Sequence, residues 1–280
     1  MKKNCPRVSV VMPIFKHSKE QLLTAINSIL NQTFKDFEFI IVDGSADEIN
    51  SQLISTIKDE RIKYFKQKGY VNCLNLGIEN SLGEYIARMD SDDISYPTRL
   101  EEQVKFLDNN PEVSLCSCLI ERFGYFEGYK KSRHKKNVDL ISTIASSEFI
   151  HTAMMFRKDI NLKYEHLKPM EDCLLFRKLL LEGYKFAIID KFLLKSYISN
   201  CSLMRKYPKY IEHFMSRINI FALAKHYNFN LSFIDEIFTK KNYTINEIDE
   251  YLKFVHLLMK KSNDHQLDVL KICKPFFSYM

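Results

Sequence analysis

Short apolar runs alternate with segments of helical spacing through the first 90 residues of this 280-residue chain. The runs have the length and residue types of buried strands, and they cover residues 8–12, 37–42, 62–65 and 85–89. After the first run, Ser18 and Gln21 form a capping-box pattern ahead of apolar residues spaced as on a helix. This alternation predicts a Rossmann-like α/β fold, with a mostly parallel central sheet that carries helices on both faces.

Polar or turn-forming residues follow three of the predicted strands. They are Pro13 and Phe15, then Asp43 and Ser45, then Asp90, Ser91, Asp92 and Asp93. In parallel sheets, ligands bind outside the carboxyl ends of the strands, near a switch in strand order. We therefore expect these three strand ends to share one crevice.

The acidic segment at residues 90–93 is the most informative of these strand ends. Carboxylates so close together repel one another unless a cation lies among them, and Mg²⁺ favours one or two carboxylates together with phosphate oxygens. The alternative is an acidic turn whose aspartates cap the following helix, which Pro97 is predicted to open. The segment alone leaves both interpretations open.

The second half of the chain is less regular. Its apolar runs predict strands at residues 113–119, 149–156, 184–189 and 192–198. Glu171 and Asp172 begin a predicted helix, and beyond Pro208 only helical patterns occur. We therefore expect a catalytic-type α/β domain at residues 1–202 and a helical C-terminal extension at residues 203–280.

The cysteine content and the hydropathy indicate where such a chain works. The seven cysteines are odd in number and lack a CxxC pair, which argues against a disulfide framework or a zinc site. They are typical of a reducing compartment. No signal-peptide pattern is visible, and no run approaches the roughly 20 apolar residues of a membrane span. We expect a cytoplasmic protein, peripheral at the inner face of the cytoplasmic membrane if it is attached at all.

The net charge of +6 is concentrated in part in the C-terminal extension, where Lys and Arg alternate with Phe, Tyr, Leu and Ile. One interpretation is a solvated face. The other is attraction to an anionic membrane surface or to a polyanionic acceptor. Nucleic acid is disfavoured as a partner, because no recognised binding motif accompanies the charge.

Several ordered blocks of the sequence resemble the family 2 glycosyltransferases. They lie at residues 8–15, 28–34, 39–47, 74–78, 83–97 and 106–113, with later landmarks at residues 151–157 and 171–172. The resemblance spans residues 7–200. It implies the GT-A fold, a nucleotide-sugar donor and an inverting reaction.

The resemblance also implies roles for individual residues. Asp92 is the metal-binding aspartate of a DxD motif, and Asp90 contacts the ribose or helps to hold the metal. The implied nucleotide-sugar-binding set is Pro13, Phe15, Asp43, Ser45, Asn75, Arg88, Asp90, Ser91, Asp92 and Asp93. Three alternatives stay open, namely core packing for Phe15, an ion pair with an aspartate for Arg88, and a turn role for Asp93.

Asp172 is the implied general base, with Glu171 beside it. The helix dipole favours the charged form of a carboxylate at this position, whereas burial and a neighbouring acid favour the protonated form. The alternative is that both residues only cap their helix. By the same resemblance, His151, Arg157 and Asn200 bind the acceptor or the diphosphate, although His151 fits a hydrogen-bonded core histidine equally well.

Two departures from the family pattern bear on the cofactor. Asp43 resembles the residue that reads the nucleobase edge, but it alone precedes Gly44, so the loop is one residue short. Asn200 stands where the family often has a histidine near the diphosphate and the metal. Since Asn is a poor transition-metal ligand, we expect Mg²⁺ or Mn²⁺ held mainly by aspartate and diphosphate.

These features predict an inverting glycosyltransferase. It moves a hexose or N-acetylhexosamine from a UDP-sugar to a hydroxyl of a surface-glycan acceptor, such as lipopolysaccharide, capsule or a lipid-linked oligosaccharide. The alternative is a catalytically silent nucleotide-sugar-binding or scaffold protein, which the short loop and the missing histidine favour. A dinucleotide-dependent oxidoreductase is disfavoured, because no GxGxxG follows the first strand.

Overall fold

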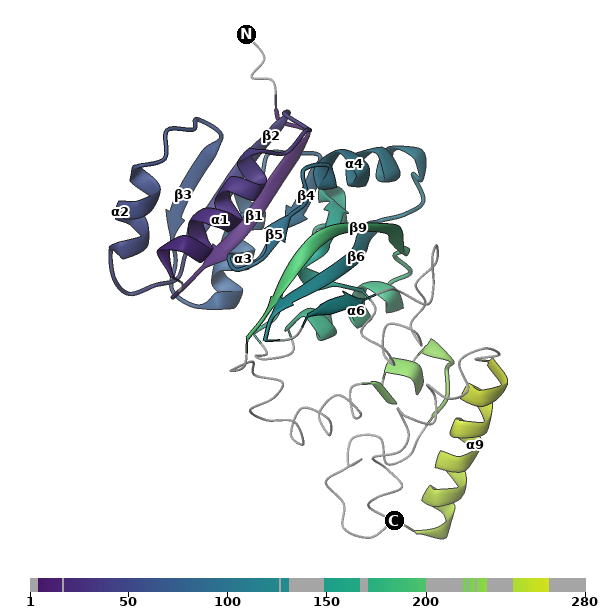
Figure 1. The fold of residues 1–280 in the computed structure, drawn as a ribbon. Helices are drawn as coiled ribbons and strands as arrows, with labels where there is room; N and C mark the ends of the chain where they lie inside the picture. The colour runs from purple at the N-terminus through teal and green to yellow at the C-terminus, as the bar shows by residue number, and fades with distance from the viewer. Residues whose placement is uncertain are drawn as a thin grey trace. The chain divides into compact units, whose positions relative to one another are not determined.

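The computed structural model describes residues 5–16, 18–125, 127–130, 149–166, 171–199, 219–220, 222–224, 226–230 and 244–261 (Figure 1). Residue contacts divide the chain into two compact units. The first unit comprises residues 1–137, 149–175 and 184–199, and the second comprises residues 138–148, 176–183 and 200–280. The domain boundary expected at residue 203 stays a prediction.

The first unit is built on a sheet whose described strands follow the order β3-β2-β1-β4-β8-β6-β9-β5, with β7 paired to β6. Its parallel part consists of β3 (Ile62–Lys66), β2 (Phe37–Asp43), β1 (Val8–Ile14) and β4 (Tyr85–Arg88). All residues of β1, β2 and β4 are buried, as expected of strands that are covered on both faces. The strands predicted for the first 90 residues are confirmed.

Helices cover both faces of this parallel part. They are α1 (Lys19–Leu30), α2 (Ile49–Ser55) and α3 (Tyr70–Glu79). Val10 and Met12 of β1 belong to one buried cluster with Leu22 of α1. Val11 points to the opposite face, because successive side chains of a strand alternate. There it meets α3 at Gly77, where an added Cβ would lie 2.3 Å from the Val11 side chain.

The second half of the sheet is mixed in direction. Its strands are β5 (Ile94–Ser95), β6 (Leu115–Gly124), β7 (Gly128–Lys130), β8 (Met155–Arg157) and β9 (Phe186–Ile198). β6 and β9 are parallel, whereas β8 runs antiparallel to both β4 and β6. The predicted parallel arrangement therefore ends at β4, because β8 inserts beside it in the reverse direction.

Two strand predictions for this half are corrected. The strand expected at residues 149–156 is a short 3₁₀ helix, His151–Ala153, followed by β8. The strands expected at residues 184–189 and 192–198 form the single strand β9. Its pairing with β6 shifts where Ile189 lies opposite Cys118 and Phe192 opposite Leu119. The intervening residues, Asp190 and Lys191, are exposed and form a bulge in β9. Two consecutive charged residues between apolar runs are also typical of a turn, which is why the sequence predicted two strands.

The helices of the second half are α4 (Arg99–Asn109) and α6 (Glu171–Leu181), and a second 3₁₀ helix spans Lys158–Ile160. Helix α4 begins at Arg99 rather than at Pro97. The Pro97 carbonyl instead accepts a hydrogen bond from the Thr33 backbone N–H (2.8 Å), which ties this loop to the end of α1. Helix α6 begins at Glu171 as predicted, and Gly183 follows its end with a φ of +91°.

Within the described part of the second unit, α9 (Ile245–Lys261) is the longest helix. Thr244 and Glu247 cap it reciprocally, with the Thr244 N–H donating to Glu247 (2.8 Å) and the Glu247 N–H donating to the Thr244 hydroxyl (3.3 Å). A helix expected at residues 211–227 lies largely outside the described residues. Among the helices that are described, none combines the length and apolar character needed to cross a membrane.

Glu38 connects the amino ends of four adjacent segments in the parallel part of the sheet. Its buried carboxylate accepts hydrogen bonds from the Ser9 hydroxyl (2.5 Å) and the Leu82 backbone N–H (2.6 Å) and forms an ion pair with Lys63. Burial acts to raise the pKa of Glu38, but these three donors outweigh it and hold that pKa below its ordinary value. Glu38 is therefore ionised in the folded protein and contributes to its stability.

Replacing Glu38 with Gln should lower the free energy of unfolding by about 1–3 kcal/mol at neutral pH, because the donors lose a charged acceptor. A carboxyl whose pKa is lowered by folding contributes stability above its unfolded pKa of 4.5 and loses it as the pH falls further. Urea unfolding should therefore show the gap between wild type and variant shrinking as the pH drops below 4.5. The matched control is Glu112→Gln, which replaces an exposed glutamate and should leave the free energy of unfolding unchanged. A difference between wild type and Glu38→Gln that is as large below pH 4.5 as at neutral pH would contradict the ionised state of Glu38.

Candidate active site

The acidic turn, residues 90–93, follows β4 and is held from inside by its last aspartate. Asp93 is buried, and its carboxylate accepts hydrogen bonds from the Thr152 hydroxyl (2.7 Å) and from the Tyr197 backbone N–H (2.8 Å). The Thr152 hydroxyl also accepts a hydrogen bond from the Asp90 N–H (3.1 Å). Burial, followed by the charges of Asp90 and Asp92, raises the pKa of Asp93. These contacts are those of the turn role that the sequence left open.

Asp90 and Asp92 are the two carboxylates of this turn that keep contact with solvent. The Asp90 side chain is 38% exposed and forms an ion pair with Arg88 (2.6 Å). Asp92 is partly buried, and burial together with the charge of Asp90 raises its pKa to about 6. Burial is the larger of these two causes, and the opposing charge of Arg88 does not cancel them.

The donor set of the turn fits a hard divalent metal ion. Asp90 and Asp92 supply carboxylate oxygens, the ligands that Mg²⁺ and Mn²⁺ prefer. Among the described residues, no group of three or more His, Cys, Asp or Glu side chains is arranged to hold a metal by itself. A metal here would therefore take further ligands from the substrate or from water.

Two arginines lie behind the acidic turn. Arg88, at the end of β4, is 2% exposed, and besides its ion pair with Asp90 it donates a hydrogen bond to the Tyr70 hydroxyl. The ion pair considered for Arg88 is thus present, and its donor-site role stays a prediction. The buried Arg99 is the first residue of α4, and its guanidinium donates to the Arg88 carbonyl (2.5 Å) and to Gln103 (3.0 Å).

Tyr70 brings the acidic turn and the start of α6 into one electrostatic environment. Burial raises the pKa of Tyr70, and the charges of Asp90, Glu171 and Asp172 raise it further, against the opposing charge of Arg88. The acidic turn and the start of α6 thus both contribute negative charge at this hydroxyl. The crevice predicted for the three strand ends stays a prediction.

Glu171 is buried, and both acids lie in the first turn of α6. The Asp172 carboxylate accepts a hydrogen bond from the Cys173 N–H (2.8 Å), a contact that the capping interpretation also allows. Tyr164 is also buried, and burial is the main reason that its pKa is raised well above its ordinary value. The negative charges of Asp172 and Glu171 raise this pKa further. The structure thus leaves both roles open for this pair.

Asp43 is enclosed by its own loop and by two neighbouring elements. Its carboxylate accepts hydrogen bonds from the Ser45 N–H (2.9 Å), from the Asn50 side chain (3.1 Å) and from the Tyr64 hydroxyl (2.7 Å). Asp43 is 0% exposed, so a base-reading role requires this arrangement to open. Ser45 lies at the surface of the same loop, partly buried.

Phe15 follows β1 and lies beside this loop. Its ring covers Gly44, where an added Cβ would come within 2.1 Å of it, and it stands 5.8 Å from the Tyr70 ring between centroids. Pro13 is buried inside β1. Ser91 is buried within the acidic turn. Of these three predicted site residues, Phe15 alone is partly exposed.

Three predicted site residues form hydrogen bonds with other parts of the protein. Asn75 is buried, and both ends of its amide bond to the Tyr164 backbone (2.9 and 3.0 Å). His151 bonds through Nε2 to the Tyr164 hydroxyl (2.5 Å), and burial with the nearby Arg88 charge holds the pKa of His151 well below its ordinary value. Arg157 donates to backbone carbonyls at the end of α4 and in the loop that follows it, including that of Leu107 (2.7 Å). Asn200 lies outside the described residues.

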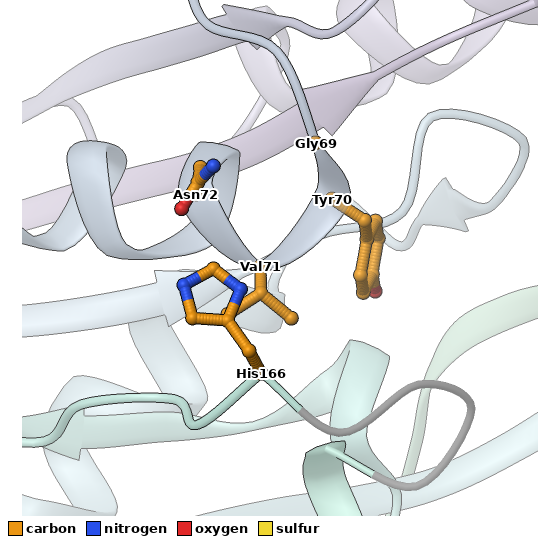
Figure 2. Close-up of a pocket in the computed structure, with 5 residues that line it drawn as sticks. All are labelled: Gly69, Tyr70, Val71, Asn72 and His166. Carbon is orange, nitrogen blue, oxygen red and sulfur yellow. The ribbon is translucent and has the colours of Figure 1, made fainter.

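A pocket of about 250 Å³ opens at the start of α3. It is lined by Gly69, Tyr70, Val71, Asn72 and His166, and Figure 2 shows His166 beside Val71 and Asn72 with Tyr70 turned away from them. Gly69 has a φ of +92°, a conformation that L side chains rarely adopt. Tyr70 is the residue here that the sequence reading missed, although its place directly after a glycine at a strand exit was a usable signal.

Comparison with known proteins identifies the family. The family "Glycosyl transferase family 2" matches residues 9–184, more than half of the chain. The chain therefore belongs to glycosyl transferase family 2. It is 30% identical over 291 residues to an uncharacterized glycosyltransferase of Rickettsia conorii, covering 91% of this chain and 48% of that protein. The chain thus spans about half the length of this relative.

One further relative and two solved structures bear on the site. An O-antigen biosynthesis glycosyltransferase of Escherichia coli, WbnJ, is 37% identical over 163 residues, covering 56% of this chain and 63% of that protein. S. aureus TarS (1–349) with UDP-GlcNAc superposes with a TM-score of 0.63 at 18% identity, over 89% of this chain and 79% of that one. A mannosyltransferase of Pyrobaculum calidifontis with GDP-Man and Mn²⁺ gives 0.58 at 14% identity, over 98% and 88%. These likenesses confirm the GT-A fold.

Metal binding at the acidic turn should strengthen with pH. Asp92 must lose its proton before it binds a metal, and its pKa is about 6. The rise in thermal midpoint caused by Mn²⁺ should therefore be larger at pH about 7.5 than at pH about 5.5. An equal Mn²⁺ effect at both pH values would contradict a role for Asp92.

The stability of the metal-free protein gives an independent check of the raised pKa of Asp92. Because folding raises the pKa of Asp92, its contribution to stability is complete below the unfolded pKa of 3.8 and is lost as the pH rises through about 6. Asp92→Asn should therefore stabilise the metal-free protein by about 1 kcal/mol at pH about 7.5 and abolish the Mn²⁺ effect.

Proposed function

We propose that the chain transfers a hexose or an N-acetylhexosamine from a UDP-sugar to a hydroxyl of a surface-glycan acceptor. The observation that carries the proposal is the acidic turn after β4, where the partly exposed Asp90 pairs with the buried Arg88 and Arg88 in turn donates to the Tyr70 hydroxyl. One acidic group at a strand end and a second at a helix start meet the two needs of sugar transfer, which are charge neutralisation on the leaving group and removal of a proton from the acceptor.

Asp92 and Asp90 are the residues proposed to hold a divalent metal ion, Mg²⁺ or Mn²⁺. A bound metal neutralises the charge that develops on the leaving diphosphate. Support comes from the partial exposure of Asp90, the raised pKa of Asp92, and the Mn²⁺ in the mannosyltransferase structure. Arg88 orients Asp90 through its ion pair, and Asp93 fixes the turn through Thr152.

Asp172 is the proposed general base, and Glu171 is its neighbour within the same helical turn. The base takes the proton of the acceptor hydroxyl as that oxygen attacks the anomeric carbon. The bond from this carbon to the diphosphate oxygen breaks in the same displacement, so the configuration inverts and no covalent sugar intermediate forms.

The choice of donor and acceptor follows the relatives. The TarS structure contains UDP-GlcNAc, which supports a UDP-sugar as donor, and Phe15 offers its ring to the base. The WbnJ name supports a surface glycan such as lipopolysaccharide as the acceptor class. Such acceptors are assembled at the cytoplasmic face of a membrane, so we propose a cytoplasmic enzyme with peripheral membrane contact through its basic C-terminal residues.

Asp92→Asn should abolish the Mn²⁺-dependent part of UDP binding, because the variant loses the ionised ligand. Calorimetric titration with UDP, in Mn²⁺ and in a chelator, measures this part directly. The control Asp36→Asn replaces an exposed aspartate and should bind as wild type does. A folded Asp92→Asn variant with unchanged Mn²⁺-dependent binding would remove the metal from this turn.

Asp172→Asn should separate binding from turnover. The variant should keep UDP-sugar affinity within about threefold and lose at least about 100-fold in transfer rate, the contribution typical of a general base. The companion variant Glu171→Gln shows which of the two acids takes the proton. An Asp172→Asn variant that transfers sugar at the wild-type rate would exclude it as the base, and one that fails to fold would favour the capping role.

A silent nucleotide-sugar-binding protein is the second candidate. The observation that favours it is the burial of Asp43, whose carboxylate is 0% exposed and already accepts three hydrogen bonds from the protein. Such a protein would bind UDP without releasing it from any donor. Turnover by wild type therefore separates the two candidates.

A further inference from the structure

Arg99 is a fully buried cation that lies behind the acidic turn. Its side chain is 0% exposed and is the largest of the fully buried side chains. The guanidinium donates to the Arg88 carbonyl (2.5 Å), to the Gln103 side chain (3.0 Å) and to the Met89 sulfur (3.2 Å), and it lies 3.5 Å from the Thr152 carbonyl. All of these acceptors are neutral.

No carboxylate forms an ion pair with Arg99 among the residues that the structure describes. Burying a charge without an ionic partner costs several kcal/mol, so its retention calls for a compensating role. Burial accordingly lowers the pKa of Arg99, and the charge of Asp93 partly offsets this effect. Among the groups whose charge acts on Arg99, Asp93 is the carboxylate, and it belongs to the acidic turn.

The partners of Arg99 connect it to both walls of the turn. The Arg88 carbonyl lies at the end of β4, two residues before Asp90. Thr152 supplies the hydroxyl that joins the Asp90 N–H to the Asp93 carboxylate. Gln103 extends the connection by donating to the Ala153 carbonyl (2.7 Å). Arg99 therefore places its positive charge directly behind the backbone from which the aspartates project.

We propose that Arg99 is a positioning residue that acts as a buried counter-charge for the acidic turn, so that the turn accepts an anionic metal–diphosphate group. This inference rests on the proposed function and adds a residue to it. Three aspartates alone would repel the diphosphate of a nucleotide sugar, and the two guanidinium groups of Arg88 and Arg99 offset most of that charge from the protein side.

The positive charge of Arg99 should have opposite effects on the binding of metal–UDP and of the metal alone, and this separates a counter-charge role from a merely structural one. A buried positive charge attracts the metal–UDP complex, which is negative overall, but it repels a bare Mn²⁺ ion. Removing the charge should therefore weaken binding of the complex without weakening binding of the metal alone. Loss of a purely structural contact would loosen the turn and weaken both.

The test compares wild type, Arg99→Met and Arg99→Lys by two titrations. Free Mn²⁺ is followed by electron paramagnetic resonance, and UDP binding in saturating Mn²⁺ is measured by calorimetry. Arg99→Met should raise the Kd of UDP by about tenfold and leave the Kd of Mn²⁺ alone unchanged or lower. Arg99→Lys keeps the charge and should recover most of the lost UDP affinity.

Arg61→Met is the matched control, because Arg61 is a partly buried arginine of the same unit that pairs with Asp59 away from the turn. It should change neither titration. If Arg99→Met fails to fold, Arg99→Gln replaces it as a neutral variant that retains an amide donor for the Arg88 carbonyl.

Two results would overturn the proposal. One is a folded neutral variant that binds UDP with Mn²⁺ as tightly as wild type, and the other is a variant that loses metal and metal–UDP binding equally. A wild-type protein that binds neither Mn²⁺ nor UDP would instead refute the proposed function, and with it this inference. The wild-type titrations therefore distinguish the two failures.

Discussion

Repulsion among three carboxylates in one short turn is the constraint on which the rest of the site depends. The structure offsets it unequally. Asp93 turns inward to Thr152 and the Tyr197 N–H, Asp90 pairs with Arg88, and Asp92 keeps a pKa of about 6 without an ionic partner among the contacts described. Asp90 and Asp92 are therefore the carboxylates of the turn that a cation from solvent can reach, and this is the physical basis for proposing a metal there.

The mixed sheet explains how this arrangement is built. The parallel strands bring Phe15, Asp43 and Asp90 to one edge, as strand order alone requires. The antiparallel insertion of β8 then places the preceding 3₁₀ helix, with Thr152, against the acidic turn. The site is therefore shared between a parallel half that presents the polar strand ends and a mixed half that holds them in place.

The sequence predicted the elements and the acidic turn well, because apolar periodicity and capping residues act locally. It did not predict the insertion of β8, since strand direction depends on contacts between distant segments. The sequence also did not show that the side chains of Asn75 and Arg157 donate to backbone carbonyls, because residue spacing does not tell where a side chain points. Arg99 went unnoticed for the same reason, as an arginine in a helical pattern normally signals an exposed face.

The most direct test is a UDP-release assay on the wild-type chain, run over common UDP-sugars with Mg²⁺ and with Mn²⁺. An active transferase should hydrolyse one donor slowly in the absence of acceptor, and only when the metal is present. Release that is independent of metal would contradict the proposed use of the acidic turn. Measurable UDP binding with no release from any donor, with or without glycan acceptors, would contradict the transferase and leave a silent nucleotide-sugar-binding protein.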